Sequence, residues 1–396
     1  MTATGRAAER ASRLPAKTGN PQGIRRTAGT ATPVFIRGKR MNLAEGIDPS
    51  GLRPVSKSLA IYELRADEIA GLTHVARELI AHHDSVENTM FAHGCMLAAQ
   101  ELPRSLRALA QRYRQLELPC SVLLLRGMPV DDTRIGASPS HWDAPWRNPP
   151  SLLEEAMQCL MTSLLGDMFG WRTQENGRFL RHIVPIRKDH AEQLGGGSSV
   201  TLVWHNEEAF HEHRADFLSI LCYRNDERAE TIFCGIDEIE IPDAMWRVLS
   251  APRFSILPDK SHLPEQNVSE QWRLDDHVFE RIRRMHENPE PVPALSGLRA
   301  KPWVRVDEAF MAALPGDDEA ERALRWLIDA CYAHQTSVVM QPGDMVWVDN
   351  KRAVHGRTVY HPNYGPRQRW LRRVNVHVNL RETLPFRQAP TTREIL

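Results

Sequence analysis

The sequence lacks a long apolar run, a net charge and closely spaced cysteines. No run approaches the roughly 18 apolar residues that a membrane-spanning helix needs. Fifty Lys and Arg residues balance fifty Asp and Glu residues, so charge gives no reason to expect nucleic acid or a membrane as a partner. The six cysteines include no CxxC pair, which argues against a structural zinc site and a disulfide framework. We therefore expect reduced thiols and a cytoplasmic location.

Acidic residues are nearly absent from the first 40 positions, where Glu9 is the only one. This stretch is rich in Ala, Thr, Gly, Pro and Arg. Its charge is typical of a transit peptide, but it has no clear amphipathic face and no apolar signal-peptide core. We predict a disordered basic tail over residues 1–57, or an upstream start in the gene, followed by a single folded domain over residues 58–396.

Hydrophobic periodicity predicts both helices and strands in the folded part. The predicted helices cover residues 66–82, 106–116, 151–165, 279–287 and 319–332. The predicted strands cover residues 120–128, 217–223, 231–234, 253–257 and 303–306. Many β segments behind a helical N-terminal portion favour a mainly β fold with flanking helices, specifically a double-stranded β-helix, or jelly roll.

A turn signal stands late in the chain. Two β-rich runs, 338–340 and 345–349, flank the residues Pro342-Gly343-Asp344, which is a hairpin signal. A loop or strand carrying His355-Gly356-Arg357 follows. The run over residues 367–376 is then expected to be a further strand.

His205 and Glu207 stand two residues apart, a spacing that places both side chains on one face of a β-strand. Both could therefore reach one metal ion, and His355, about 150 residues later, could supply a third ligand. Two histidines and one carboxylate are the ligand set of non-heme Fe(II) oxygenases, and the long separation excludes an HExxH helix. Chance is the alternative, since 17 histidines and 50 acidic residues make one His-x-acid pair expected.

Two arginines follow the second histidine. Arg369 comes fourteen residues after His355, and Arg373 lies on the same face as Arg369 if residues 367–376 form a strand. A guanidinium can bind a carboxylate through two parallel hydrogen bonds. The pair could therefore hold one carboxylate of a cosubstrate and one of a substrate. A basic edge strand is the alternative.

These segments resemble the clavaminate synthase-like group of Fe(II)/2-oxoglutarate oxygenases, and within it the free amino acid hydroxylases of antibiotic pathways. The matching pieces are WHNEEAFHEHRADFL, TIFCGID, QPGDMVWVDNKRAVHGR and RWLRRVNV. The resemblance runs from about Trp171 to Leu380, and a weaker match reaches back to about Leu59. No single piece is specific, but the set is.

The resemblance implies a role for each cofactor-binding position. His205, Glu207 and His355 are expected to be catalytic iron ligands. Arg369 stands where the family's arginine binds 2-oxoglutarate, and Thr231 lies close to where relatives use a threonine on the same carboxylate. The implied cofactors are Fe(II), the cosubstrate 2-oxoglutarate and O2.

The resemblance also implies substrate contacts. Arg373 is expected to bind the substrate carboxylate. Gln174 and Glu207 are expected to contact the α-amino group. Asp307 is expected to contact the far end of the substrate side chain. An equal alternative is that Asp307 is an ordinary turn residue at the end of a strand. Arginine hydroxylases use two aspartates on the guanidinium, and Ala309 stands where the second would be. Arginine itself is therefore an open question.

A glycine run, Gly195 to Gly197, precedes the first ligand strand. No Lys-Ser/Thr follows it and no helix comes next, so we do not expect a phosphate-binding loop. We expect a flexible active-site loop that brings Ser198, Ser199 or backbone amides against the substrate. A plain turn is the equal alternative.

The implied reaction is hydroxylation of an unactivated C–H bond of a free α-amino acid, with release of succinate and CO2. The side chain is expected to be arginine-like, ureido or otherwise polar. A carboxylate at position 207 argues against a halogenase, which keeps that position free for chloride. Desaturation, cyclisation and a carrier-tethered substrate remain open, and more distantly a cupin-type metalloprotein or a binding module without activity. A homodimer and a carrier-protein partner are compatible with the sequence.

Overall fold

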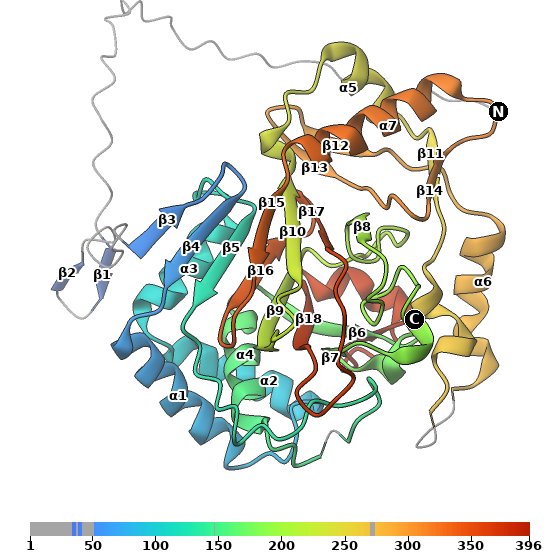
Figure 1. Cartoon of the computed structure of the whole chain (residues 1–396). Coiled ribbons are helices and arrows are strands. Elements are labelled where there is room, and N and C mark those ends of the chain that lie inside the picture. Colours follow the sequence, from blue (N-terminus) through green and yellow to red (C-terminus); the bar gives the residue numbers. More distant parts are fainter. Residues whose placement is uncertain (1–33, 37–38, 42–50, 146, 270–273) are drawn as a thin grey trace, which may run out of the picture. The chain divides into compact units, whose positions relative to one another are not determined.

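The computed structural model describes residues 34–36, 39–41, 51–145, 147–269 and 274–396. The chain divides into two compact units, Met1–Glu45 and Gly46–Leu396. In the first unit, β1 (Val34–Ile36) pairs antiparallel with β2 (Lys39–Met41). The other positions of the predicted basic tail up to residue 50 lie outside the described residues. The second unit contains all the remaining elements (Figure 1).

The larger sheet of the second unit has nine strands. Its order is β19 (Glu394–Ile395), β6 (Asp167–Trp171), β18 (Trp370–His377), β9 (Phe217–Arg224), β16 (Met345–Asp349), β5 (Val122–Arg126), β4 (Leu59–Glu63) and β3 (Leu52–Pro54), with β7 (Leu180–Ile183) also beside β18. The central strands β18, β9, β16 and β5 pair antiparallel. Leu52 pairs with Tyr62, so the sheet begins six residues before the expected domain start at residue 58.

The smaller sheet has four antiparallel strands, in the order β15 (Thr336–Val339), β10 (Glu230–Gly235), β17 (Ala353–Arg357) and β8 (Leu202–His205). One face of it packs on the larger sheet, because Phe233 and Ala353 share a buried cluster with Leu218 and Val346. Side chains alternate along a strand, so the residues next but one to Ala353 on β17 also face this interior between the sheets.

Four helices cover the outer face of the larger sheet. They are α1 (Ala66–Ile80), α2 (Thr89–Ala98), α3 (Arg104–Arg114) and α4 (Leu152–Ser163). Leu72 of α1 and Leu160 of α4 belong to the same buried cluster as Leu123 and Trp347 of the sheet. α1, α3 and α4 confirm three predicted helices. α2 has no predicted counterpart, because it is short and its overall sequence is apolar without a strong periodicity.

A second layer covers the outer face of the smaller sheet. It contains α5 (Asp243–Leu249), α6 (Glu280–Glu287), α7 (Asp318–Ala333) and two small sheets, β11 (Phe254–Ile256) with β14 (Met311–Ala313) and β12 (Leu295–Leu298) with β13 (Lys301–Val304). Trp204 and Val354 pack in one buried cluster with Leu327 of α7. α6 and α7 confirm the two predicted C-terminal helices. The fold is therefore mainly β with flanking helices, as predicted, and no helix of the described residues is long and apolar enough to cross a membrane.

The hairpin predicted across Pro342-Gly343-Asp344 is wrong. β15 pairs with β10 in the smaller sheet, whereas β16 pairs with β5 and β9 in the larger one. The turn therefore carries the chain from one sheet to the other. Gly343 has φ +85°, and a Cβ there would lie 2.3 Å from the carbonyl oxygen of Met128. The segment that carries His355 is the regular strand β17 rather than a loop.

Candidate active site

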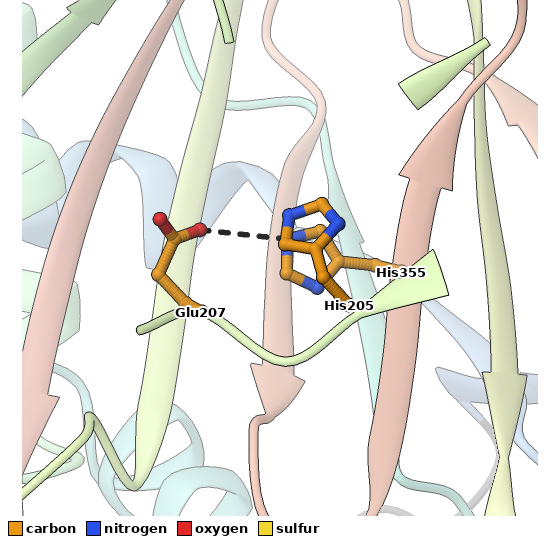
Figure 2. A group of neighbouring side chains, drawn as sticks. All are labelled: His205, Glu207 and His355. Atoms are coloured by element: carbon orange, nitrogen blue, oxygen red, sulfur yellow. Dashed lines mark ion pairs between the residues drawn. The ribbon is translucent and has the colours of Figure 1, made fainter. Parts of the chain in front are cut away.

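Three predicted metal ligands meet at the inner face of the smaller sheet. His205 ends β8 and lies directly opposite His355 of β17, with ring centroids 4.2 Å apart. Glu207 follows β8, and its Oε2 lies 3.6 Å from His355 Nε2. One donor atom from each of the three side chains lies within 4.8 Å of the others. Figure 2 shows the carboxylate turned toward the two imidazoles.

Glu207 stands just past the strand rather than within it, since β8 ends at His205. Two asparagines hold this segment. The Asn206 side chain donates to the carbonyl oxygens of Asn350 and Ala353, both at 2.9 Å. The Asn350 side chain accepts from the N–H of Glu207 at 2.8 Å and donates to its carbonyl oxygen at 3.1 Å. The strand alternation alone therefore does not position Glu207; side-chain bonds to its backbone do.

The pKa shifts of His205 and Glu207 suit a divalent cation. His205 Nδ1 lies 2.9 Å from the carbonyl oxygen of Val203, which leaves Nε2 for a metal. Burial, and then the neighbouring His355, lower the pKa of His205. Burial acts to raise the pKa of Glu207, but Arg373 and the two histidines together hold it well below its usual value. Neutral imidazoles and an ionised carboxylate are the forms that bind metal. Glu207 Oε2 is also buried without a hydrogen-bond partner among the described residues, so the site fits iron.

All the predicted site residues except Ser198 line one cavity with the triad. Ser198 is buried in the preceding loop, where its N–H donates to the carbonyl oxygen of His190 at 2.9 Å. The loop contributes Gly195 and Gly196 to the cavity instead. Ser198 itself is not among the residues that line the cavity, and its contact with the substrate stays a prediction.

The predicted cosubstrate residues present unpaired donors to this cavity. Nε and Nη1 of Arg369, which immediately precedes β18, are buried without hydrogen-bond partners among the described residues. Thr231 Oγ1, on β10, is also buried without a hydrogen-bond partner among the described residues. A buried guanidinium without a partner is costly, so an anionic ligand here would complete the site. Arg357, which was given no role from the sequence, lines the same cavity.

The predicted substrate residues line the same cavity. Arg373 forms an ion pair with Glu207, and its Nη2 lies 3.6 Å from Glu208 Oε1. Gln174 donates through Nε2 to Ser261, while its Oε1 is buried without a partner. Both Gln174 and Arg373 thus keep polar atoms available, since Arg373 Nε is also unpartnered among the described residues.

Three aspartates line the cavity: Asp189, Asp259 and Asp307. Asp307 forms a β-bridge with His205, and burial raises the pKa of its carboxyl to about 7. Its Oδ1 accepts from the N–H groups of Ala309 and Phe310, both at 3.1 Å. Asp259 was given no role from the sequence. Gln266 and Asn267, a few residues later, also line the cavity, and the polarity of this part of the sequence was the only available signal.

Comparisons with known proteins agree with this geometry. The family model "Taurine catabolism dioxygenase TauD, TfdA family" matches residues 97–375. The enduracididine beta-hydroxylase of Streptomyces hygroscopicus is 38% identical over 341 residues, covering 84% of this chain and 98% of that one. The L-ornithine/L-arginine 3-hydroxylase of Catenulispora acidiphila is 34% identical over 342 residues, with coverage of 84% and 98%.

Solved structures lead to the same class. The non-heme iron oxygenase OrfP in complex with Fe, succinate and (3S)-hydroxy-L-Arg superposes with a TM-score of 0.80 at 32% identity, covering 85% of this chain and 99% of that one. OrfP has also been solved with Fe and alpha-ketoglutaric acid. Fold, ligand set and relatives together define a non-heme iron oxygenase that uses 2-oxoglutarate and O2. The chain belongs to the TauD/TfdA family.

Proposed function

We propose that this oxygenase hydroxylates an unactivated C–H bond of a free α-amino acid whose side chain is cationic. The observation that carries the proposal is the content of one cavity: the metal triad, Arg373, and the two acids Asp259 and Asp307. An arginine suits a substrate carboxylate, and two neighbouring, partly buried acids suit a positive side chain. The relatives named for enduracididine, ornithine and arginine support this charge pattern.

His205, Glu207 and His355 would hold the iron, and Arg369 with Thr231 would hold the far carboxylate of 2-oxoglutarate. When bound, iron, 2-oxoglutarate and O2 supply the oxidising power that breaks the C–H bond, with succinate and CO2 as by-products. The protein's own contribution is to position the substrate and exclude water. Val203 orients the ring of His205, and Asn350 orients Glu207.

Two unpaired atoms support the proposed position of the amino acid. Arg373 Nε is a buried donor without a partner among the described residues and would bind the substrate carboxylate. Gln174 Oε1 is a buried acceptor that also has no partner among the described residues, and it would accept a hydrogen bond from the α-ammonium group. The negative charge of Glu207 lies against Arg373 and would also face the amine. A zwitterion therefore satisfies groups that the protein leaves open.

Asp259 changes the inference drawn from Ala309. The absence of a second aspartate at position 309 left arginine in doubt, but Asp259 provides another carboxylate in the same cavity. Its charge contributes to the raised pKa of Asp307, so the two acids are close enough to interact. Two carboxylates that repel each other gain most from a shared cationic group. A guanidinium or ammonium side chain is therefore favoured over a ureido one.

The test is an aerobic turnover assay with Fe(II), 2-oxoglutarate and a panel of amino acids. The panel contains arginine, enduracididine, ornithine and lysine as cations, with citrulline and asparagine as neutral comparisons. We expect succinate to form in equal amount to a product that has gained one oxygen atom. Turnover should be faster with the cationic amino acids than with the neutral ones. Loss of two hydrogens instead would indicate desaturation or cyclisation. Preference for citrulline or asparagine would contradict the charge argument, and turnover only on a loaded carrier protein would support the tethered alternative.

We also propose finer features of the chain. The two sheets enclose the site between them, which supports a double-stranded β-helix, and the fold over residues 58–396 would form one catalytic domain. The six free, buried cysteines are compatible with the predicted reducing cytoplasm. A homodimer and a carrier-protein partner stay predictions, for which size measurement in solution and pull-down with a loaded carrier are the tests.

A further inference from the structure

A second arginine lies in the interior between the sheets. Arg357 stands two residues after His355 on β17, and residues two apart on a strand share a face. It lines the same cavity as the triad and is 3% exposed. Its Nη2 donates to the carbonyl oxygen of Val200 at 3.2 Å. Its Nε and Nη1 are buried and have no hydrogen-bond partner among the described residues.

Arg357 and Arg369 form a pair of buried cations. The ring of Tyr360 contacts both: its centroid lies 4.9 Å from Cζ of Arg357 and 5.5 Å from Cζ of Arg369. Both guanidinium groups carry their charge at neutral pH, as arginine side chains in proteins do. Within the described residues, neither guanidinium has a carboxylate at ion-pair distance. Buried charges are normally paired, so this pair calls for an anion.

Thr231 adds a third group at the same place. It is the Cα partner of Arg357 across β10 and β17, and its hydroxyl is buried without a partner among the described residues. Along β17, His355 and Arg357 are separated by two residues, or about 6.6 Å at the usual rise of a strand. That span is of the order of a five-carbon dicarboxylic acid with one end at the metal. The anion that fits is the cosubstrate.

We propose that Arg357 is a second arginine that binds the far carboxylate of 2-oxoglutarate, together with Arg369 and Thr231. The carboxylate would receive hydrogen bonds from two guanidinium groups, and Tyr360 would stack beside both. Arg357 would thereby select a dicarboxylic 2-oxo acid over one with an apolar tail. The proposal rests on 2-oxoglutarate as cosubstrate and is independent of which amino acid is hydroxylated.

A purely structural role for Arg357 makes a different prediction. Its bond to Val200 could simply anchor the segment before β8, and Tyr360 N–H also holds that segment through the carbonyl oxygen of Ser198 at 3.1 Å. In that case, loss of Arg357 would disturb His205 at the end of β8. All 2-oxo acids that chelate the iron would then bind more weakly, whether or not they carry a second carboxylate.

The experiment measures binding, without turnover and without the amino acid substrate. Fe(II)-loaded wild-type enzyme and the R357M variant are titrated anaerobically by calorimetry with 2-oxoglutarate and with 2-oxovalerate, which has the same chain length but no far carboxylate. We expect R357M to weaken 2-oxoglutarate binding by about 10- to 100-fold, the usual effect of losing a hydrogen bond to a charged group. Binding of 2-oxovalerate should change little. R357K, which keeps the charge but not the fork, should fall between wild type and R357M.

The matched control is R187M, which removes another arginine stacked on a tyrosine. Cζ of Arg187 lies 4.2 Å from the ring centroid of Tyr364, and Arg187 does not line the cavity. It should leave both affinities unchanged. Equal weakening of both 2-oxo acids by R357M, or no change in either, would overturn the proposal. Because no amino acid is present, an incorrect substrate assignment cannot produce either result.

A structure of the wild-type enzyme with Fe(II) and 2-oxoglutarate covers the case in which R357M does not fold. We expect a guanidinium nitrogen of Arg357 within about 3.2 Å of the far carboxylate. The proposal would be wrong if Arg369 and Thr231 contacted the far carboxylate while Arg357 still bonded only to Val200. This result needs no variant.

Discussion

Asn350 holds both backbone groups of Glu207. Its side-chain oxygen accepts from the Glu207 N–H at 2.8 Å, and its side-chain nitrogen donates to the Glu207 carbonyl oxygen at 3.1 Å. The same nitrogen also donates to the carbonyl oxygen of Ala215 at 2.9 Å. Asn350 is fully buried and does not itself touch the metal position. One amide thus fixes the only acidic ligand to the loop that leads into β17.

Replacing Asn350 by alanine should therefore weaken metal binding. The lost bonds leave Glu207 free to move and its N–H and carbonyl groups buried without partners. Groups that orient metal ligands typically contribute about 10- to 100-fold in affinity. We expect a loss in that range when Fe(II) or Co(II) binding to N350A is measured by competition with a chelator. N363A, which removes an exposed asparagine that bonds Glu227, should bind metal as wild type does. Unchanged affinity in N350A would show that Glu207 is held by other contacts.

Replacing Asp307 by asparagine should reduce activity most on cationic substrates. The variant keeps the shape of the side chain and its bonds to the two backbone N–H groups, but removes a charge from the cavity. Loss of a hydrogen bond between charged groups costs about 1.5–3 kcal/mol, so kcat/KM for the preferred cationic amino acid should fall by about 10- to 100-fold. D259N should behave similarly.

Two comparisons check that this loss comes from charge in the cavity. Turnover of a neutral amino acid such as citrulline should fall much less in D307N, measured as succinate released. D226N removes an exposed carboxylate that pairs with Arg367 outside the cavity and should not discriminate between the substrates. An equal loss on citrulline and arginine would instead point to an effect of Asp307 on His205, to which it is bridged.

The metal triad could be predicted because its signal is local and chemical. The His-x-Glu spacing, the later His355 and Arg369 each stand in recognisable short runs, and the structure brings them to one cavity. The position of Glu207 past the end of β8 could not be predicted. It depends on Asn206 and Asn350, and the latter lies more than 140 positions away in the chain. Neither asparagine differs in sequence from an ordinary turn residue.

The errors share a physical cause. Pro342-Gly343-Asp344 is a true turn, but which strands pair on either side is decided by β10 and β5, which are distant in sequence. Asp259 could not be distinguished within a polar segment, because nothing local says that the segment faces a cavity.

Stability should depend on pH through Glu87. Its carboxylate accepts from the N–H groups of Phe179 and Leu180 at 3.0 and 2.9 Å, where β7 begins, and burial raises its pKa from 4.5 to about 7. The folded state keeps this proton over a range in which the unfolded chain loses it. The contribution of Glu87 to stability therefore falls as pH rises from about 4.5 to about 7.

The neutral variant E87Q should lack this dependence. Between about pH 5 and pH 7, the free energy of unfolding of wild type should fall relative to E87Q by about 1–3 kcal/mol, measured by urea unfolding at each pH. E101Q, at an exposed position before α3, is the control and should follow the wild-type curve. Parallel curves for wild type and E87Q would mean that the two backbone N–H groups keep Glu87 ionised in the folded protein.

The turn at Gly343, where the chain crosses from one sheet to the other, should tolerate a side chain less well than Gly316, a glycine with a similar backbone conformation. Gly343 has φ +85° and a Cβ there would lie 2.3 Å from the Met128 carbonyl oxygen, whereas Gly316 has φ +81° with nothing within 4 Å of the added atom. G316A should lose only the cost of the left-handed backbone, about 1–2 kcal/mol. G343A should lose this and the clash as well, at least about 1 kcal/mol more in urea unfolding.

The clash in G343A also has a consequence for the site. Met128 N–H donates to the carbonyl oxygen of Gly343 at 3.0 Å, so moving the turn shifts β16, the strand that leads to Asn350 and then to His355. G343A should therefore bind Fe(II) more weakly than G316A. Equal metal affinity in the two variants, despite unequal stability, would mean that the loop through Asn350 keeps its position without the turn.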